Sequence, residues 1–229
     1  MSLPLMVRSV ALRILIPFAL IGPVWFDFGG VTSPPDPRTA NALEGCGGPS
    51  ALVPLQELDP LATGTILDYP EMRIRDRAPV GEDIHSGYFR TTGTNREFRR
   101  GFMEFAIPQF RVAPDRVTLI FAEGPGTIAP EAPDVDHELS WYPADGRVDV
   151  ADYDRPTTFV GGFQDDMQDA NNVWSFDVTG LVRGSQGRCL GFRAKLVLDP
   201  GEAGYRALGT SIGRYSWITP HLEFAFGST

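Results

Sequence analysis

The stretches RGFMEFAIP (100–108) and RVTLIFAEG (116–124) decide the fold of this chain. In the first stretch Met103, Phe105 and Ile107 occupy every second position, which is the period of a β-strand with two distinct faces. The second stretch is almost continuously apolar, which is typical of a central strand that is covered on both faces. Both stretches therefore predict strands, and the second is predicted to lie at the centre of a sheet.

Short strands are also predicted on either side of this pair. VWSFDV (173–178) alternates apolar and short polar residues, and CLGFRAKLVLD (189–199) is the longest predicted strand. TGLVRGS (179–185) predicts a single helical turn. The pattern indicates about eight to ten strands, and their connections are longer than two-residue hairpins. We therefore predict an all-β fold, a jelly-roll β-sandwich.

The composition agrees with one domain of this class. The chain has 229 residues, of which 42% are hydrophobic, enough for one core of ordinary size. Its 25 glycines and 20 prolines are spread along the sequence, which favours short strands joined by turns. Residues 31–61 lack periodicity, and we interpret them as a linker or irregular arm. The sandwich is predicted over residues 62–229.

Residues 1–30 have the features of an export signal. Arg8 and Arg13 precede the uncharged stretch ILIPFALIGPVWF (14–26), which suits a signal core and is short for a membrane-spanning helix. No clear cleavage motif follows, and LEGC (43–46) resembles a lipoprotein box only faintly. We expect a secreted or extracytoplasmic protein that has no membrane association once the signal is removed.

The charge and the cysteines fit this location. A formal net charge of −9 argues against nucleic acid as a partner, because nucleic-acid binding needs a positive surface. Cys46 and Cys189 are predicted to form a disulfide, the alternative being two unpaired thiols. The bond would attach the arm to the domain and stabilise it by roughly 3–5 kcal/mol in the chain-entropy model.

Four segments together resemble a known class of domain. RRGFMEFAIP, RVTLIFAEG, WSFDVTGLVRG and the closing region from 189 to 226 follow the order of motifs in DNRLRE-type domains and PEP-CTERM-like proteins, which are secreted bacterial jelly-roll modules. Ala106 stands where that family often has Asp, which weakens any ion site carried over from it. The resemblance implies a secreted β-sandwich, and some relatives bind polysaccharide while many are accessory domains.

Acidic loops are candidate calcium sites. Asp165, Asp166 and Asp169 lie in QDDMQDANN (164–172), and Ca²⁺ prefers such clustered oxygen ligands. DVADYD (149–154) is a second candidate. The alternative, which we favour, is a solvated loop without a metal.

Aromatic side chains near turns are candidate sugar-binding residues. Tyr142, Tyr153 and Tyr215 are predicted as exposed rings, because a flat ring beside polar groups can stack on a sugar face. The alternative for each of them is ordinary core packing.

Catalysis is weakly supported. The sequence has no nucleophile elbow, phosphate loop or zinc-protease motif, and we assign no catalytic residue. A pair of carboxylates could still hydrolyse glycosides, and the candidates are Glu104, Glu138, Asp149 and Asp177. For Asp177 we favour a turn-capping role together with Thr179.

The leading hypothesis is a non-catalytic extracellular module that binds polysaccharide or cell-surface glycan, or that forms a structural part of the surface. The rivals are a secreted polysaccharide hydrolase and a purely structural protein-interaction domain.

Overall fold

The computed structural model describes residues 46, 55–78, 84–90, 95–124, 135–165, 172–197, 207–212 and 218–227. The predicted export signal and most of the predicted arm lie outside these residues. The described part contains twelve strands, a short 3-10 helix (η1, Val150–Asp154) and one turn-and-a-half of α-helix (α1, Thr179–Gly184). The strands are β1 (Glu57–Leu58), β2 (Ala62–Tyr69), β3 (Ile74–Arg77), β4 (Ile84–Arg90), β5 (Arg96–Ala106), β6 (Arg116–Gly124), β7 (Val135–Ala144), β8 (Thr158–Asp165), β9 (Val173–Asp177), β10 (Cys189–Leu196), β11 (Ala207–Ile212) and β12 (His221–Ala225).

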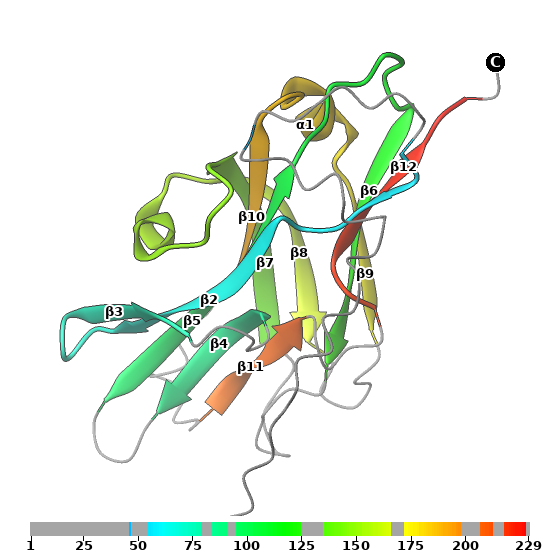
Figure 1. Ribbon diagram of the computed structural model, residues 1–229. Helices are drawn as coiled ribbons and strands as arrows, with labels where there is room; N and C mark the ends of the chain where they lie inside the picture. Colours follow the sequence, from blue (N-terminus) through cyan, green and yellow to red (C-terminus); the bar gives the residue numbers. More distant parts are fainter. Residues whose placement is uncertain are drawn as a thin grey trace, which may run out of the picture. The chain divides into compact units, whose positions relative to one another are not determined.

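The strands form two antiparallel sheets (Figure 1). The larger sheet has the order β8-β7-β10-β5-β4-β11, and the hairpin β2–β3 adds to the other edge of β5 through β2. The smaller sheet has the order β1-β12-β6-β9. At one end Ser211 and Ile212 of β11 pair with the last residues of β6, which links the two sheets. Most neighbouring strands are not consecutive in sequence, so the chain crosses between sheets as it does in jelly rolls. The predicted all-β sandwich is confirmed.

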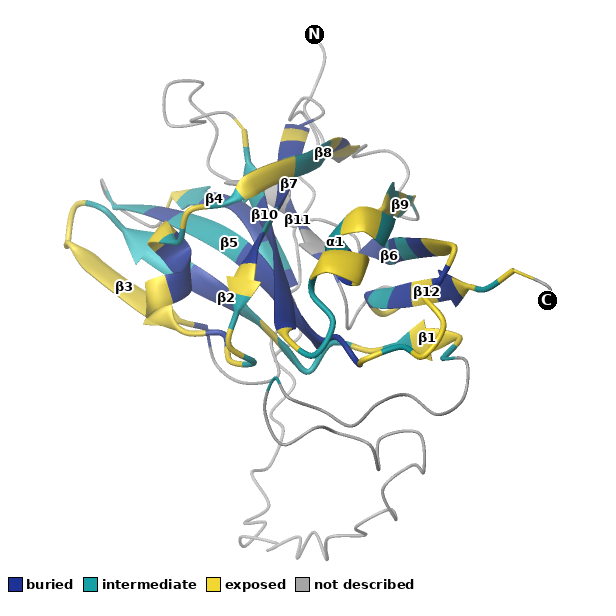
Figure 2. Ribbon diagram, turned by 90° about the horizontal axis from the view of Figure 1, so that it is seen from above, coloured by how far each residue is buried: buried dark blue, intermediate teal, exposed yellow. Residues whose placement is uncertain are grey.

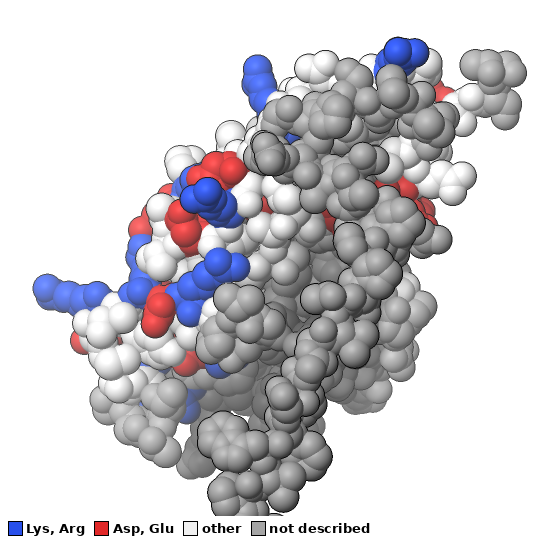
Figure 3. All heavy atoms as spheres, in the orientation of Figure 1, with Lys and Arg blue, Asp and Glu red and all other residues white. Residues whose placement is uncertain are grey.

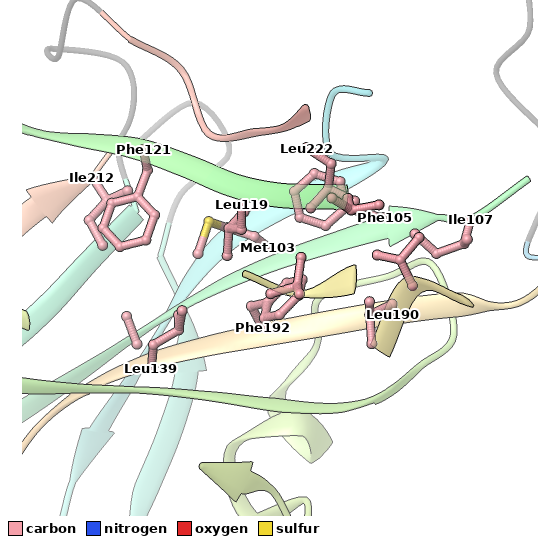
Figure 4. Packing of buried hydrophobic residues seen from close by; sticks show 14 of the residues in the cluster. Met103, Phe105, Ile107, Leu119, Phe121, Leu139, Leu190, Phe192, Ile212 and Leu222 are labelled. Atoms are coloured by element: carbon pink, nitrogen blue, oxygen red, sulfur yellow. The ribbon is translucent and has the colours of Figure 1, made fainter. Parts of the chain in front are cut away.

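The main core lies between the two sheets. It is built by the alternating residues of β5 together with side chains from β6, β7, β10, β11 and β12 (Figure 4). Met103, Phe105 and Leu119 are fully buried there. Figure 2 shows buried positions along β5, β6 and β10, whereas β3 is exposed along its whole length. The two stretches that predicted the fold therefore supply opposite sides of this core.

A second, smaller apolar cluster lies on the outer face of the larger sheet. Ile66 of β2, Phe102 of β5 and Tyr142 of β7 pack there against Val148 and Tyr153. The last two residues belong to the segment between β7 and β8 that contains η1. This segment folds back over the sheet and turns an exposed face into a buried one.

The predicted arm takes part in the domain. Glu57 and Leu58 pair with β12, and Leu55 and Leu58 pack against the main core. The disulfide between Cys46 and Cys189 is present in the structure and joins positions 143 residues apart. The first strand of the sandwich therefore lies at Glu57–Leu58. We had predicted that the sandwich starts at residue 62.

Among the described residues, no helix has the length and apolarity needed to cross a membrane.

Candidate functional site

A largely buried group of charged and polar side chains lies between the outer face of the larger sheet and the segment 145–157, which contributes three of them. We call it the Glu104 cluster, and its members are Glu104, Tyr142, Asp152, Tyr153, Arg155, Arg100 and Arg193. Glu104 and Asp152 have no exposed surface, and Arg193 is 6% exposed. Buried charges are rare unless they are paired or hydrogen-bonded, so the contacts of this cluster decide what it can do.

The centre of the cluster is a row of residues across three strands. Tyr142 of β7 lies opposite Gly191 of β10, which lies opposite Glu104 of β5. A Cβ atom at Gly191 would come within 2.4 Å of the Tyr142 ring. The missing side chain therefore lets the ring cross β10, and the Tyr142 hydroxyl donates a hydrogen bond of 2.7 Å to Glu104 Oε1.

The turn after β7 closes the other side of Glu104. The backbone N–H of Gly146 donates to Glu104 Oε2 over 2.7 Å. Gly146 has a φ of 88°, a conformation that glycine adopts without steric cost. A Cβ at this position would also lie 3.4 Å from both sulfur atoms of the disulfide. The carboxyl group, the turn and the disulfide thus pack as one unit.

Asp152 holds the 3-10 helix in place. Its carboxylate accepts a hydrogen bond from the backbone N–H of Asp149 and forms an ion pair with Arg155, whose Nε lies 2.8 Å from Asp152 Oδ1. The Asp149 side chain in turn accepts from the N–H of Ala151, which completes a capping box at the start of η1.

Two arginines of the sheet bind the end of η1. The carbonyl oxygen of Tyr153 accepts from Arg100 Nη1 over 2.6 Å and from Arg193 Nη1 over 3.0 Å. Arg193 also donates to the carbonyl of Arg155 and to the Thr157 hydroxyl. The guanidinium of Arg100 lies 3.7 Å from the centre of the Tyr153 ring. These contacts fasten the segment 145–157 to β5 and β10.

Burial shifts the protonation of this cluster. Burial raises the pKa of Glu104 from 4.5 to about 7, against the lowering effect of the hydrogen bonds from Tyr142 and Gly146. Burial likewise raises the pKa of Asp152 and, together with the Glu104 charge, raises the pKa of Tyr142 above its usual range. A carboxyl group that titrates near neutrality can in principle transfer protons. The side chains of Glu104 and Tyr142 are nevertheless sealed from solvent, so the cluster joins parts of the fold and offers no surface to a substrate.

The predicted sugar-binding tyrosines do not form an exposed platform. Tyr142 is 0% exposed and Tyr153 is 3% exposed, so the expectation of exposed rings was wrong for both. The reason is the returning segment 145–157, which covers the outer face on which Tyr142 lies and itself carries Tyr153 into the small core. Tyr215 lies outside the described residues.

The four candidate carboxylates do not gather in one cleft. Glu104 is buried as described, and Glu138 of β7 pairs with Lys195, whose Nζ lies 3.2 Å from its Oε2. Asp149 caps η1. Asp177, at the end of β9 in the smaller sheet, accepts from the backbone N–H and the hydroxyl of Thr179, which lowers the pKa of Asp177.

The predicted turn-capping role of Asp177 is therefore present in the structure. Thr179 extends it, because its hydroxyl accepts from the N–H of Val117 in the neighbouring strand. The hydrogen bonds tie the start of α1 to β6.

The calcium candidates fall largely outside the described part of the chain. Asp165 is the last residue of β8, and Asp166 and Asp169 lie beyond the described residues. In the second candidate loop, Asp149 and Asp152 have the contacts given above, and Asp154 pairs with Arg75. Within the described ranges, no three side chains of the metal-ligating types come together as a metal site would require.

A buried serine–histidine pair lies elsewhere in the larger sheet. The Oγ atom of Ser86 is 2.9 Å from His137 Nδ1, and the His137 ring stacks on Phe163 with the ring centres 5.0 Å apart. Burial lowers the pKa of His137 to about 3. Ser86 and His137 are 0% and 1% exposed, so the pair belongs to the core and not to a solvent-accessible nucleophile site.

Sequence reasoning missed the three arginines of the cluster, Arg100, Arg155 and Arg193, and the neighbouring Gly191. One signal was available, because CLGFRAKLVLD places a charged residue inside an apolar strand, on the same face as Cys189 and Gly191. Such a residue in a central strand needs a buried partner. The sequence did not indicate which residue binds Arg193, because the Tyr153 carbonyl lies about forty residues away in an irregular segment.

No protein-family model matches the chain, and no curated protein sequence matches it.

Proposed function

We propose that this protein is a non-catalytic, extracytoplasmic β-sandwich module that binds carbohydrate. The resemblance to secreted jelly-roll modules supports carbohydrate as the ligand. The observation that carries the non-catalytic part of the proposal is the placement of the four acids that a glycoside hydrolase would have used. Each of Glu104, Glu138, Asp149 and Asp177 serves a separate structural purpose, and they lie on different elements of the fold. A hydrolase needs two carboxyl groups facing one substrate bond, and these four do not supply them.

The disulfide supports the location. Disulfides persist in oxidising compartments outside the cytoplasm, and this one ties the predicted arm to the sandwich. Antiparallel sandwiches also present broad surfaces on which a polymer can lie. Both features fit an accessory module that is exported and holds its ligand without transforming it.

A protein-interaction domain is the second candidate, and the edge strand β8 favours it. Among the described strands, β8 pairs only with β7, and its Phe159 is 64% exposed. An open edge with an exposed aromatic side chain can accept a strand from another protein.

A retention assay tests the proposal. The purified full chain is mixed with insoluble cellulose, chitin and cross-linked polygalacturonate, in calcium or in EDTA, and bound protein and released reducing sugar are measured in the same tubes. Saturable retention on at least one polymer without sugar release is the expected result. Sugar release, or no retention on any polymer, would overturn the proposal, and loss of retention in EDTA would assign calcium a part in binding.

A further inference from the structure

One end of the larger sheet is unusually rich in arginine. Of the 20 basic residues in the chain, seven lie between residues 73 and 100. We call this group the arginine end, and it consists of Arg73, Arg75, Arg77, Arg90, Arg96, Arg99 and Arg100. Basic side chains are visible over the β2–β3 hairpin in Figure 3. Residues 66–100 contain seven arginines and six acids, a net charge of +1, so the rest of the chain carries −9 − 1 = −10.

The tip of the β2–β3 hairpin is attached to the start of β5. Glu71 accepts from the backbone N–H of Arg96 over 3.0 Å and from its Nε over 2.6 Å. The next residues of the tip include Arg73, which is exposed and has a φ of 55°. Residues other than glycine rarely adopt this left-handed conformation, and such residues cluster at functional sites.

Two arginines lie directly opposite each other beside this tip. Arg90, the last residue of β4, is the cross-strand partner of Arg96. Like charges in this position destabilise a sheet unless an opposite charge compensates them. Glu71 compensates Arg96, whereas the guanidinium groups of Arg73 and Arg90 have no hydrogen-bond or ion-pair partner among the residues that the structure describes.

Aromatic rings orient the neighbouring guanidinium groups. Arg99 lies over Phe89 at 4.1 Å from the ring centre, and Arg96 lies over Phe98 at 5.9 Å. The rings of Phe98 and Tyr88 are in contact, with centres 5.3 Å apart. Both stacked guanidinium groups are already paired with a carboxylate, Arg96 with Glu71 and Arg99 with Glu97. The guanidinium groups of Arg73 and Arg90 remain to bind a ligand, and a planar guanidinium matches a carboxylate with two parallel hydrogen bonds.

We infer that the arginine end binds an acidic polysaccharide through its carboxylate groups. This inference rests on the proposed carbohydrate binding and names the class of ligand. The unpaired guanidinium groups of Arg73 and Arg90 supply the charge. The half-buried ring of Phe98 lies on the same face of the sheet as Arg90 and supplies flat surface for the sugar.

The test uses matched polymers and matched variants of the full chain. The acidic polymers are polygalacturonate, alginate and chondroitin sulfate, and the neutral polymers are cellulose, chitin and fully methyl-esterified polygalacturonate, which keeps the backbone and removes the charge. The variant R73Q/R90Q removes the two unpaired guanidinium groups. The control R111Q/R188Q removes two exposed arginines near the opposite end of β5 and changes the net charge equally. All four arginines are exposed in the structure. Thermal unfolding checks that both variants fold.

The expected result is retention on an acidic polymer that weakens about tenfold in R73Q/R90Q and less than about twofold in the control. Equal weakening in both variants would overturn the assignment of the site, because it would reflect net charge alone. Retention on neutral polymers only would overturn the inference and leave the proposed function standing. Retention on no polysaccharide would overturn both.

Discussion

At the scale of the residue, Glu104 is a closely constrained side chain. It receives hydrogen bonds from Tyr142 and Gly146, faces the negative charges of Asp152 and Asp145, and has no exposed surface. Its pKa is raised from 4.5 to about 7 chiefly by burial. The folded state therefore prefers the protonated form, and the carboxylate form is penalised.

This preference predicts how stability depends on pH. The favourable contribution of Glu104 is complete below its unfolded pKa of 4.5 and is lost as the pH rises through about 7. The loss amounts to as much as about 3 kcal/mol. Glu104→Gln, which does not titrate, should gain stability relative to the wild type between pH 5 and pH 8 in urea unfolding. The exposed Glu57→Gln is the control, and a pH-independent difference for Glu104→Gln would contradict the assignment.

Gly191 carries the second prediction at this scale. Gly191→Ala should destabilise the protein by about 1–3 kcal/mol, because a methyl group there overlaps the Tyr142 ring. Gly180→Ala is the matched control, since a Cβ at Gly180 meets nothing within 4 Å and lies in α1. Denaturant unfolding measures both. Equal stability of the two variants would show that the ring does not depend on the glycine.

At the scale of the element, the segment 145–157 determines which face of the sheet is exposed. Asp145 and Gly146, which begin the segment after β7, are residue types that favour a turn. The return of the segment over the sheet could not be predicted, because its path depends on Arg100 and Arg193 of two other strands.

The central strands were predictable because period-two alternation and apolar runs are local signals, as in β5 and β6. Tyr142 was misplaced for the same physical reason: strand alternation assigns a side chain to a face and does not say what covers that face.

Removing the anchor of this segment should loosen it. Arg193→Met eliminates hydrogen bonds to two backbone carbonyls and to Thr157, and we expect a loss of about 2–4 kcal/mol together with faster proteolysis between residues 145 and 157. The exposed Arg188→Met is the control. Unchanged proteolysis of Arg193→Met would mean that other contacts hold the segment.

At the scale of the whole molecule, the disulfide joins the predicted arm to the sandwich. Cys46→Ala/Cys189→Ala should lower the free energy of unfolding by roughly 3–5 kcal/mol in the chain-entropy model. Urea unfolding of the wild type with and without reductant should give the same difference, while reductant leaves the double variant unchanged. A double variant as stable as the oxidised wild type would contradict this role.

We propose that the chain binds carbohydrate without cleaving it. The most direct test is the amount of full-length protein removed from solution by each polysaccharide, measured beside the reducing ends formed in the same tube over a day. We expect saturable depletion by an acidic polymer, with no increase in reducing ends above a protein-free control. An increase in reducing ends in proportion to protein concentration would contradict non-catalytic binding and would support a polysaccharide hydrolase.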